Sequence, residues 1–215
     1  MKKRVDLVSG NIIGTLITLS LPILGTSFIQ MAYNLVDMIW IGKAGSAAVA
    51  AIGTAGFFSW FGNSLVLITK TGAEVGVSQS IGKNDECERN SYIYSSITLA
   101  LIMAIVYTVI LILFKKELIG FFNLGDVEII KMSLDYLIII ALGMICAFLN
   151  PQFTGIFTAS GNSKTPFIVN TIGLIVNIVL DPILIFGIGK VSPLGVKGAA
   201  LATVLSQLLV TIIFI

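Results

Sequence analysis

Six long apolar stretches occupy almost the whole of this 215-residue chain. Each is long enough for an α-helix to cross the hydrocarbon core of a bilayer, which takes roughly 20 apolar residues. Charged residues make up only 11% of the chain, against roughly 25% in a soluble domain. The sequence therefore predicts an all-α membrane protein with six transmembrane helices and no soluble domain of any size. The stretches cover residues 12–41, 46–69, 91–114, 134–159, 166–189 and 196–215.

The residue types that are scarce exclude several classes of function. The chain has no histidine, the commonest general base and metal ligand, and its two cysteines lack a CxxC spacing. Hydrolytic triads that use histidine are ruled out, and we expect no cofactor. A net charge of +2, without a long basic run, argues against nucleic acid as a partner. An enzyme is the weakest alternative, because nothing in the sequence resembles a nucleophile with its base.

Basic residues suggest how the chain is oriented. Lys2, Lys3 and Arg4 cluster just before the first apolar stretch. The positive-inside rule favours, by a small margin, an amino terminus in the cytoplasm of a multi-pass cell-membrane protein. In that orientation the first and fifth helices both run outward. The chain stops at Ile215 inside an apolar run, so we expect either a truncation or one part of a longer transporter.

Two carboxylates lie inside otherwise apolar, helix-length runs. Asn34 precedes Asp37 by about one helical turn, and Asn177 precedes Asp181 by a similar step. A charged side chain near the middle of a bilayer costs roughly 2.5 to 3.5 kcal/mol on insertion scales, so such residues usually face a bundle interior or a wet cavity. The two Asn and Asp pairs therefore predict a functional site.

Asp37 belongs to a polar stripe on the first predicted helix. Gln30, Asn34 and Asp37 follow the spacing i, i+4, i+7, which places them on one helical face. Tyr33 lies one turn before Asp37 on that helix. We expect the stripe to face the bundle and to line a cavity. The alternative is a carboxylate near the outer interface that snorkels towards water.

Asp181 is followed at once by Pro182, which has no backbone N–H to donate. The carbonyl of Ile178 then loses its helical partner, a pattern found in helices that line ion sites. The alternative is a lone buried acid that Asn177 satisfies in a kinked helix. Two carboxylates close together in a low-dielectric interior cannot easily both stay ionised. They could hold a proton or, with amide and hydroxyl oxygens, a sodium ion, and the sequence does not distinguish the two.

Two further acids have a lysine four residues before them. Glu74 follows Lys70 inside the second predicted helix, and Asp135 follows Lys131 at the edge of the fourth. Residues at this spacing are neighbours on a helix surface. We predict an ion pair in each case. For Glu74 a role in lining a cavity stays open beside the structural one.

Several segments together resemble the multidrug and toxic compound extrusion (MATE) family of secondary transporters. They are LPILGTSFIQMAYNLVDMIWIG, VSQSIGKND, ASGNSKTP, NIVLDPILIFGIG and LGVKGAALATVLSQ. The resemblance implies a twelve-helix transporter built from two six-helix lobes, of which residues 1–215 form the amino-terminal lobe without the second. It also implies a cation site made by Asp37 and Asp181, with polar neighbours from the rest of the bundle. Those neighbours are Asn177, Tyr136, Asn150 and Thr203.

The leading hypothesis is thus one lobe of an antiporter, coupled to H⁺ or Na⁺, that exports organic and mainly cationic compounds by alternating access. Its expected partners are membrane lipid, a small organic substrate, and either a second six-helix lobe or a homodimer partner. A flippase for lipid-linked precursors is a first alternative, but it should carry several buried cations, and Lys70 is the one clear intramembrane cation. A membrane subunit that transports nothing is the second.

Overall fold

The computed structural model describes residues 12–187 and 192–215 of the chain, which form seven helices. The basic cluster at residues 2–4, from which the orientation was predicted, lies outside the described residues. Six of these helices are long and apolar enough to cross a membrane, which confirms the predicted fold class. The helices are α1 (Ile12–Ala44), α2 (Ser46–Gly82), α3 (Glu86–Leu113), α4 (Lys115–Gly120), α5 (Val127–Ala159), α6 (Lys164–Phe186) and α7 (Val196–Phe214).

Two helices begin earlier than their apolar stretches, because a polar residue caps each of them. The side chain of Asp85 accepts a hydrogen bond of 2.9 Å from the backbone N–H of Glu88 at the start of α3. Asp126 accepts one of 2.8 Å from the N–H of Glu128 at the start of α5. Such caps satisfy N–H groups that have no partner within the helix. Apolar length alone therefore underestimates these helices by several residues.

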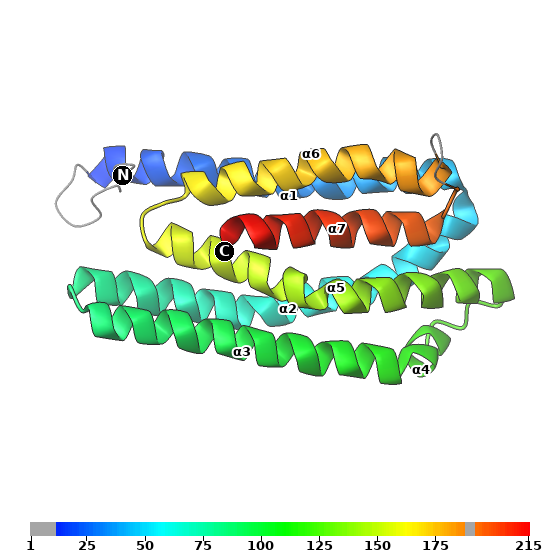
Figure 1. The fold of residues 1–215 in the computed structure, drawn as a ribbon, viewed down its shortest axis with the longest axis horizontal. Coiled ribbons are helices and arrows are strands. Elements are labelled where there is room, and N and C mark those ends of the chain that lie inside the picture. The colour runs from blue at the N-terminus through cyan, green and yellow to red at the C-terminus, as the bar shows by residue number, and fades with distance from the viewer. Residues whose placement is uncertain (1–11, 188–191) are drawn as a thin grey trace.

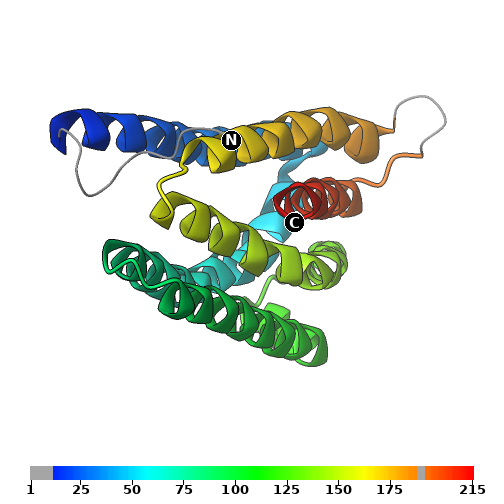
Figure 2. The same ribbon diagram turned by 60° about the vertical axis from the view of Figure 1, so that its left-hand side comes forward.

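The helices form two groups with α7 between them (Figures 1 and 2). Helices α1 and α6 lie side by side and run in the same direction, as predicted for the first and fifth membrane helices (Figure 1). Helix α5 packs against α2, α3 and α7, and α7 also packs against α6. The main apolar core, which includes Leu137 and Phe148, fills the α2, α3 and α5 group. Any site shared by α1 and α6 must therefore be completed by α7 and α5.

A single residue joins α1 to α2. Gly45 stands between α1 and α2 with φ of 112°, a backbone conformation open to glycine and strained for other residues. Although α1 and α2 follow each other directly, they contact each other far less than α1 contacts α6. The chain thus turns sharply at Gly45, and α1 packs mainly against α6 rather than against α2.

The predicted ion pair between Lys131 and Asp135 is wrong. Asp135 instead pairs with Lys197 of α7, with 3.2 Å between the Lys197 Nζ and the Asp135 Oδ2. The start of α7 lies beside the start of α5, so a partner from another helix replaces the neighbour on the same helix. The pair links the two helices at the end of the bundle where both begin.

One amide in the core of α5 is buried without a partner. The side chain of Gln152 is 0% exposed, and neither its oxygen nor its nitrogen is hydrogen-bonded within the part of the chain that the structure describes. Leaving a buried polar group unsatisfied costs about 1–3 kcal/mol. The residue is therefore a local source of instability.

Replacing Gln152 by methionine, which has a similar shape and no amide, should raise the free energy of unfolding by about 1–3 kcal/mol. Thermal unfolding of the purified chain in detergent measures this. The matched control is Gln79→Met, because Gln79 is exposed on α2 and should gain no stability. A loss of stability in Gln152→Met would mean that this amide is bonded in the bilayer.

Candidate cation site

Four helices bring polar side chains to the same level of the bundle. Asp37 and Asp181 lie seven and five residues before the ends of α1 and α6. Thr203 and Tyr136 lie seven and nine residues after the starts of α7 and α5. These helix termini all meet at one end of the bundle (Figure 1). At about 1.5 Å per residue, all four side chains lie roughly 8 to 14 Å from that end.

Asn177 is the bridge between the two carboxylates. The orientation of an amide follows from its hydrogen-bond partners, and here its nitrogen must face the acids. In this orientation Asn177 donates to Asp37 Oδ1 at 2.9 Å and to Asp181 Oδ2 at 3.3 Å. The two carboxyl groups are also close enough to interact directly with each other. One amide on α6 therefore holds an acid of its own helix and an acid of α1 together.

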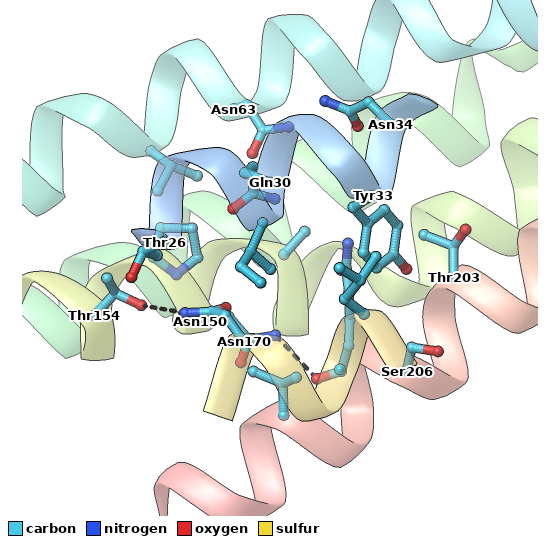
Figure 3. A pocket seen from close by; sticks show the side chains of 18 of the residues that line it. Thr26, Gln30, Tyr33, Asn34, Asn63, Asn150, Thr154, Asn170, Thr203 and Ser206 are labelled. Atoms are coloured by element: carbon cyan, nitrogen blue, oxygen red, sulfur yellow. Dashed lines mark hydrogen bonds between the residues drawn. The ribbon is translucent and has the colours of Figure 1, made fainter. Parts of the chain in front are cut away.

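Two tyrosines and a threonine surround this bridge. The hydroxyl of Tyr33 donates to the carbonyl oxygen of Asn177 at 3.2 Å, and Tyr33 also lies close to Thr203. Figure 3 shows Tyr33 and Thr203 facing each other from α1 and α7. Tyr136 of α5 is buried within electrostatic range of both carboxylates. The acids thus lie among oxygen atoms from four helices.

The two acids differ in how far they are shielded. Asp181 is 1% exposed and Asn177 is 0% exposed. Asp37 is only partly buried and lines a large cavity, as do Tyr33, Tyr136 and Thr203. An ion arriving through the cavity would meet Asp37 first and Asp181 behind it.

That cavity has a volume of about 1220 Å³ and lies between the α1 and α6 pair and the α2 and α5 pair. Its wall is mixed: apolar side chains alternate with amides and hydroxyls, several of which appear in Figure 3. Pockets for drug-sized ligands occupy about 300 to 1,000 Å³ and combine apolar walls with a few polar groups. The cavity is large enough for an organic molecule.

Asn150 lies apart from the two acids. Its nitrogen donates to the backbone carbonyl of Gln207 at 2.9 Å, and its oxygen accepts from the hydroxyl of Thr211 at 2.7 Å. These bonds tie α5 to α7. Asn150 lines the same cavity, so its assignment to a cation network stays a prediction, and its observed bonds hold two helices together.

The other residues expected at a cavity wall are spread along it. Gln30 and Asn34 line it from α1, and Glu74 lines it from α2 together with Lys70. Lys70 and Glu74 form the predicted ion pair, with 3.6 Å between Lys70 Nζ and Glu74 Oε1. These residues share a cavity with Asp37 without belonging to the cluster around Asn177.

The side chains around Asn177 limit which ions this site could bind. Over residues 12–187 and 192–215, no three carboxylates, cysteines or histidines come together as a metal site would require. Two carboxylates, an amide and hydroxyl oxygens are suited to a proton or to a monovalent ion that prefers oxygen ligands. Because the ligands come from several helices, binding an ion would change how those helices pack.

Tyr33 and Ser206 are among the residues of the cavity wall that were not predicted as site residues. Tyr33 completes the bridge through Asn177, and its position four residues before Asp37 was the signal for it. Ser206 is 1% exposed, lines the cavity, and has no hydrogen-bond partner among the described residues. Its only signal is that it follows Thr203 by three residues on α7.

The MatE family profile matches residues 22–183. The probable multidrug resistance protein NorM of Thermotoga maritima is 29% identical over 192 residues, which is 89% of this chain and 41% of that protein. The FAD transporter of Shewanella oneidensis is 26% identical over 208 residues, 97% of this chain and 46% of that protein.

A solved structure agrees with the sequence matches. The crystal structure of MATE in complex with MaD3S matches with a TM-score of 0.89 and 27% identity, and the match covers 100% of this chain and 47% of that one. The chain thus spans less than half the length of these relatives. It belongs to the MatE family, whose members are membrane transporters rather than enzymes, and its six membrane helices match one lobe of the family's fold.

Proposed function

We propose that this chain is the amino-terminal lobe of an antiporter that couples the entry of H⁺ or Na⁺ to the export of organic compounds by alternating access. The observation that carries the proposal is the bridge of Asn177 between Asp37 and Asp181 at the wall of the cavity. This bridge supports an ion site that borders the proposed ligand cavity, as coupling between two ligands requires.

Coupling would act through the packing of α1, α6 and α7. A cation that neutralises Asp37 and Asp181 removes the repulsion between them, while Asn177 and Tyr33 keep the two helices in register. Because Asp37 and Tyr33 also line the cavity, the change alters the surface that meets the substrate. By reciprocity, bound substrate changes the affinity for the cation by the same factor.

A second lobe is the proposed partner, because the chain covers less than half of its relatives. It would be supplied by further chain, by a separate lobe or by a second copy in a homodimer. The proposed location is the cell membrane with the amino terminus in the cytoplasm. Helix α1 exposes apolar side chains such as Leu21 and Phe28, which lipid or the second lobe would cover.

The proposed substrates are amphiphilic organic molecules with a positive charge. Asp37 offers a carboxylate to such a group at one end of the cavity, and the apolar wall accepts the rest of the molecule. The relatives' names include both multidrug resistance proteins and an FAD transporter, so substrate class varies within the family. Flippases for anionic lipids are less well supported, because Lys70 is the single basic residue among the described residues that line the cavity.

The test is export by the assembled transporter, with its second lobe present, after Asp37→Asn and Asp181→Asn. Each change keeps the shape and removes a charge that the cation must neutralise. Since coupling free energies of 1–3 kcal/mol correspond to 5- to 150-fold changes, we expect cation-driven export to fall about tenfold or more. Glu128→Gln, at an exposed acid outside the cavity, is the control. Full cation-coupled export by both aspartate variants would overturn the proposal.

A further inference from the structure

A polar stripe on α2 faces the cavity opposite the stripe on α1. Its members recur every three or four residues, so they share one helical face, and all of them line the cavity. Most are uncharged, but the stripe contains one acid and one base. The members are Ser59, Asn63, Lys70, Glu74 and Ser78, with the apolar Val66 among them.

The charged pair on this stripe lies far from the two aspartates. Asp37 lies eight residues before Gly45, and Lys70 lies twenty-five residues after it. At about 1.5 Å per residue, the two are separated by up to roughly 25 Å along the helices. The cavity therefore has charge at both ends, with Asp37 at one and Lys70 with Glu74 at the other, and uncharged wall between them.

The ion pair is loose enough to take a further partner. The Nζ of Lys70 lies 3.6 Å from Glu74 Oε1, whereas charge-assisted hydrogen bonds measure about 2.7–2.9 Å. The Lys70 and Glu74 side chains are 28% and 34% exposed. An ammonium group has three donors, and the described residues supply it with no hydrogen bond shorter than this contact. Lys70 can thus donate into the cavity.

The backbone of α5 holds the pair in place. A Cβ added at Gly155 would lie 3.1 Å from the Cγ atoms of both Lys70 and Glu74. The stems of both side chains therefore pack on the surface that glycine leaves open, and their charged ends are fixed relative to the cavity. Two charges are costly inside a membrane protein, and such residues usually mark a substrate or ion pathway.

We propose that Lys70 recognises a carboxylate on the transported molecule, and that Glu74 neutralises Lys70 while the cavity is empty. This inference rests on the proposed function and narrows its substrate class to elongated amphiphiles that carry a positive group and a carboxylate. The positive group would lie towards Asp37 and the carboxylate at Lys70. Such a ligand matches the charges at both ends of the cavity.

The test compares a cationic rhodamine dye that carries a free carboxylate at the end of an alkyl chain, long enough to span the roughly 25 Å between the two ends of the cavity, with the methyl ester of the same dye, which lacks that charge and keeps the positive one. Binding to the purified chain in phosphatidylcholine nanodiscs is followed by fluorescence polarisation. We expect the acid to bind more tightly than the ester. Lys70→Met should weaken binding of the acid about tenfold, as the loss of one charge-assisted bond predicts, and leave the ester unchanged. Lys70→Arg should keep the preference.

The Glu74→Gln variant distinguishes recognition of a carboxylate by Lys70 from a purely structural role of the ion pair. Without its counter-charge Lys70 should bind the acid dye more tightly, whereas a structural pair would lose stability and affect both dyes alike. Lys131→Met, at an exposed lysine of α5 outside the cavity, is the control. Equal binding of both dyes, or a preference that survives Lys70→Met, overturns this inference and leaves the proposed function standing. Failure of both dyes to bind overturns the ligand cavity as well.

Discussion

Replacing Asn177 by leucine is expected to lower the free energy of unfolding by about 3 kcal/mol, since it leaves buried, charged groups without their donor. The leucine fills a similar space but cannot donate to Asp37 and Asp181 or accept from Tyr33. We also expect the stabilisation by Na⁺ or by protons to disappear. Without the bridge, an ion bound at one acid no longer holds α1 against α6.

Thermal unfolding of the purified chain, recorded over a series of Na⁺ concentrations and pH values, measures both effects. Asn63→Leu is the matched control. Asn63 lines the same cavity, but it is exposed and its one hydrogen bond among the described residues, of 3.2 Å, goes to the Ser59 carbonyl of its own helix. It should unfold like the unchanged chain. Ion-dependent stability that persists in Asn177→Leu would show that the bridge does not hold the ion site together.

Among substitutions that add a single methyl group, Gly198→Ala should destabilise the fold most. A Cβ at this buried position of α7 would lie 2.8 Å from the backbone nitrogen of Ile185 and closer still to the Leu184 carbonyl. Backbone atoms cannot rotate away from the added methyl group, as the atoms of a side chain can. The same part of α6 accepts hydrogen bonds of 3.0 Å from the N–H groups of Leu194 and Gly195. Overpacking here should cost about 3 kcal/mol and separate α7 from α6.

The yield of folded protein and its melting temperature in detergent report this loss. Gly53→Ala is the control, because a Cβ at Gly53 meets nothing within 4 Å. Alanine should even stabilise α2 there, by about 0.5–1 kcal/mol. If Gly198→Ala melts at the same temperature as Gly53→Ala, the close contact between α6 and α7 is not required for the fold.

Features that depend on one helix were predictable from the sequence. Apolar length gave the six membrane helices, and helical spacing placed Lys70 beside Glu74 and Asn177 beside Asp181. Local geometry decides such pairs, because residues four apart on a helix are always neighbours. Even so, the same rule failed for Asp135, whose partner comes from α7.

The spacing of residues along single helices could not predict features that depend on packing between helices. Asp37 contacts Asn177 because α1 packs on α6 rather than along α2. Only the resemblance to a family predicted that Asp37 and Asn177 share a site. The burial of Gln152 without a partner had no signal in the sequence. Tertiary contacts bring together residues far apart in the chain, and a periodic pattern does not encode which faces meet.

A rotation between α1 and α2 at Gly45 would act on two arms of unequal length. Asp37 lies about 12 Å from it along α1, and Lys70 lies about 37 Å from it along α2. For rigid helices, a rotation of about ten degrees at this glycine moves Asp37 by ~2 Å and Lys70 by ~6 Å. A small rotation thus widens the end of the cavity that holds the ion pair while the aspartates barely separate. Such a rotation would let the cavity change its size while the proposed cation site keeps its geometry.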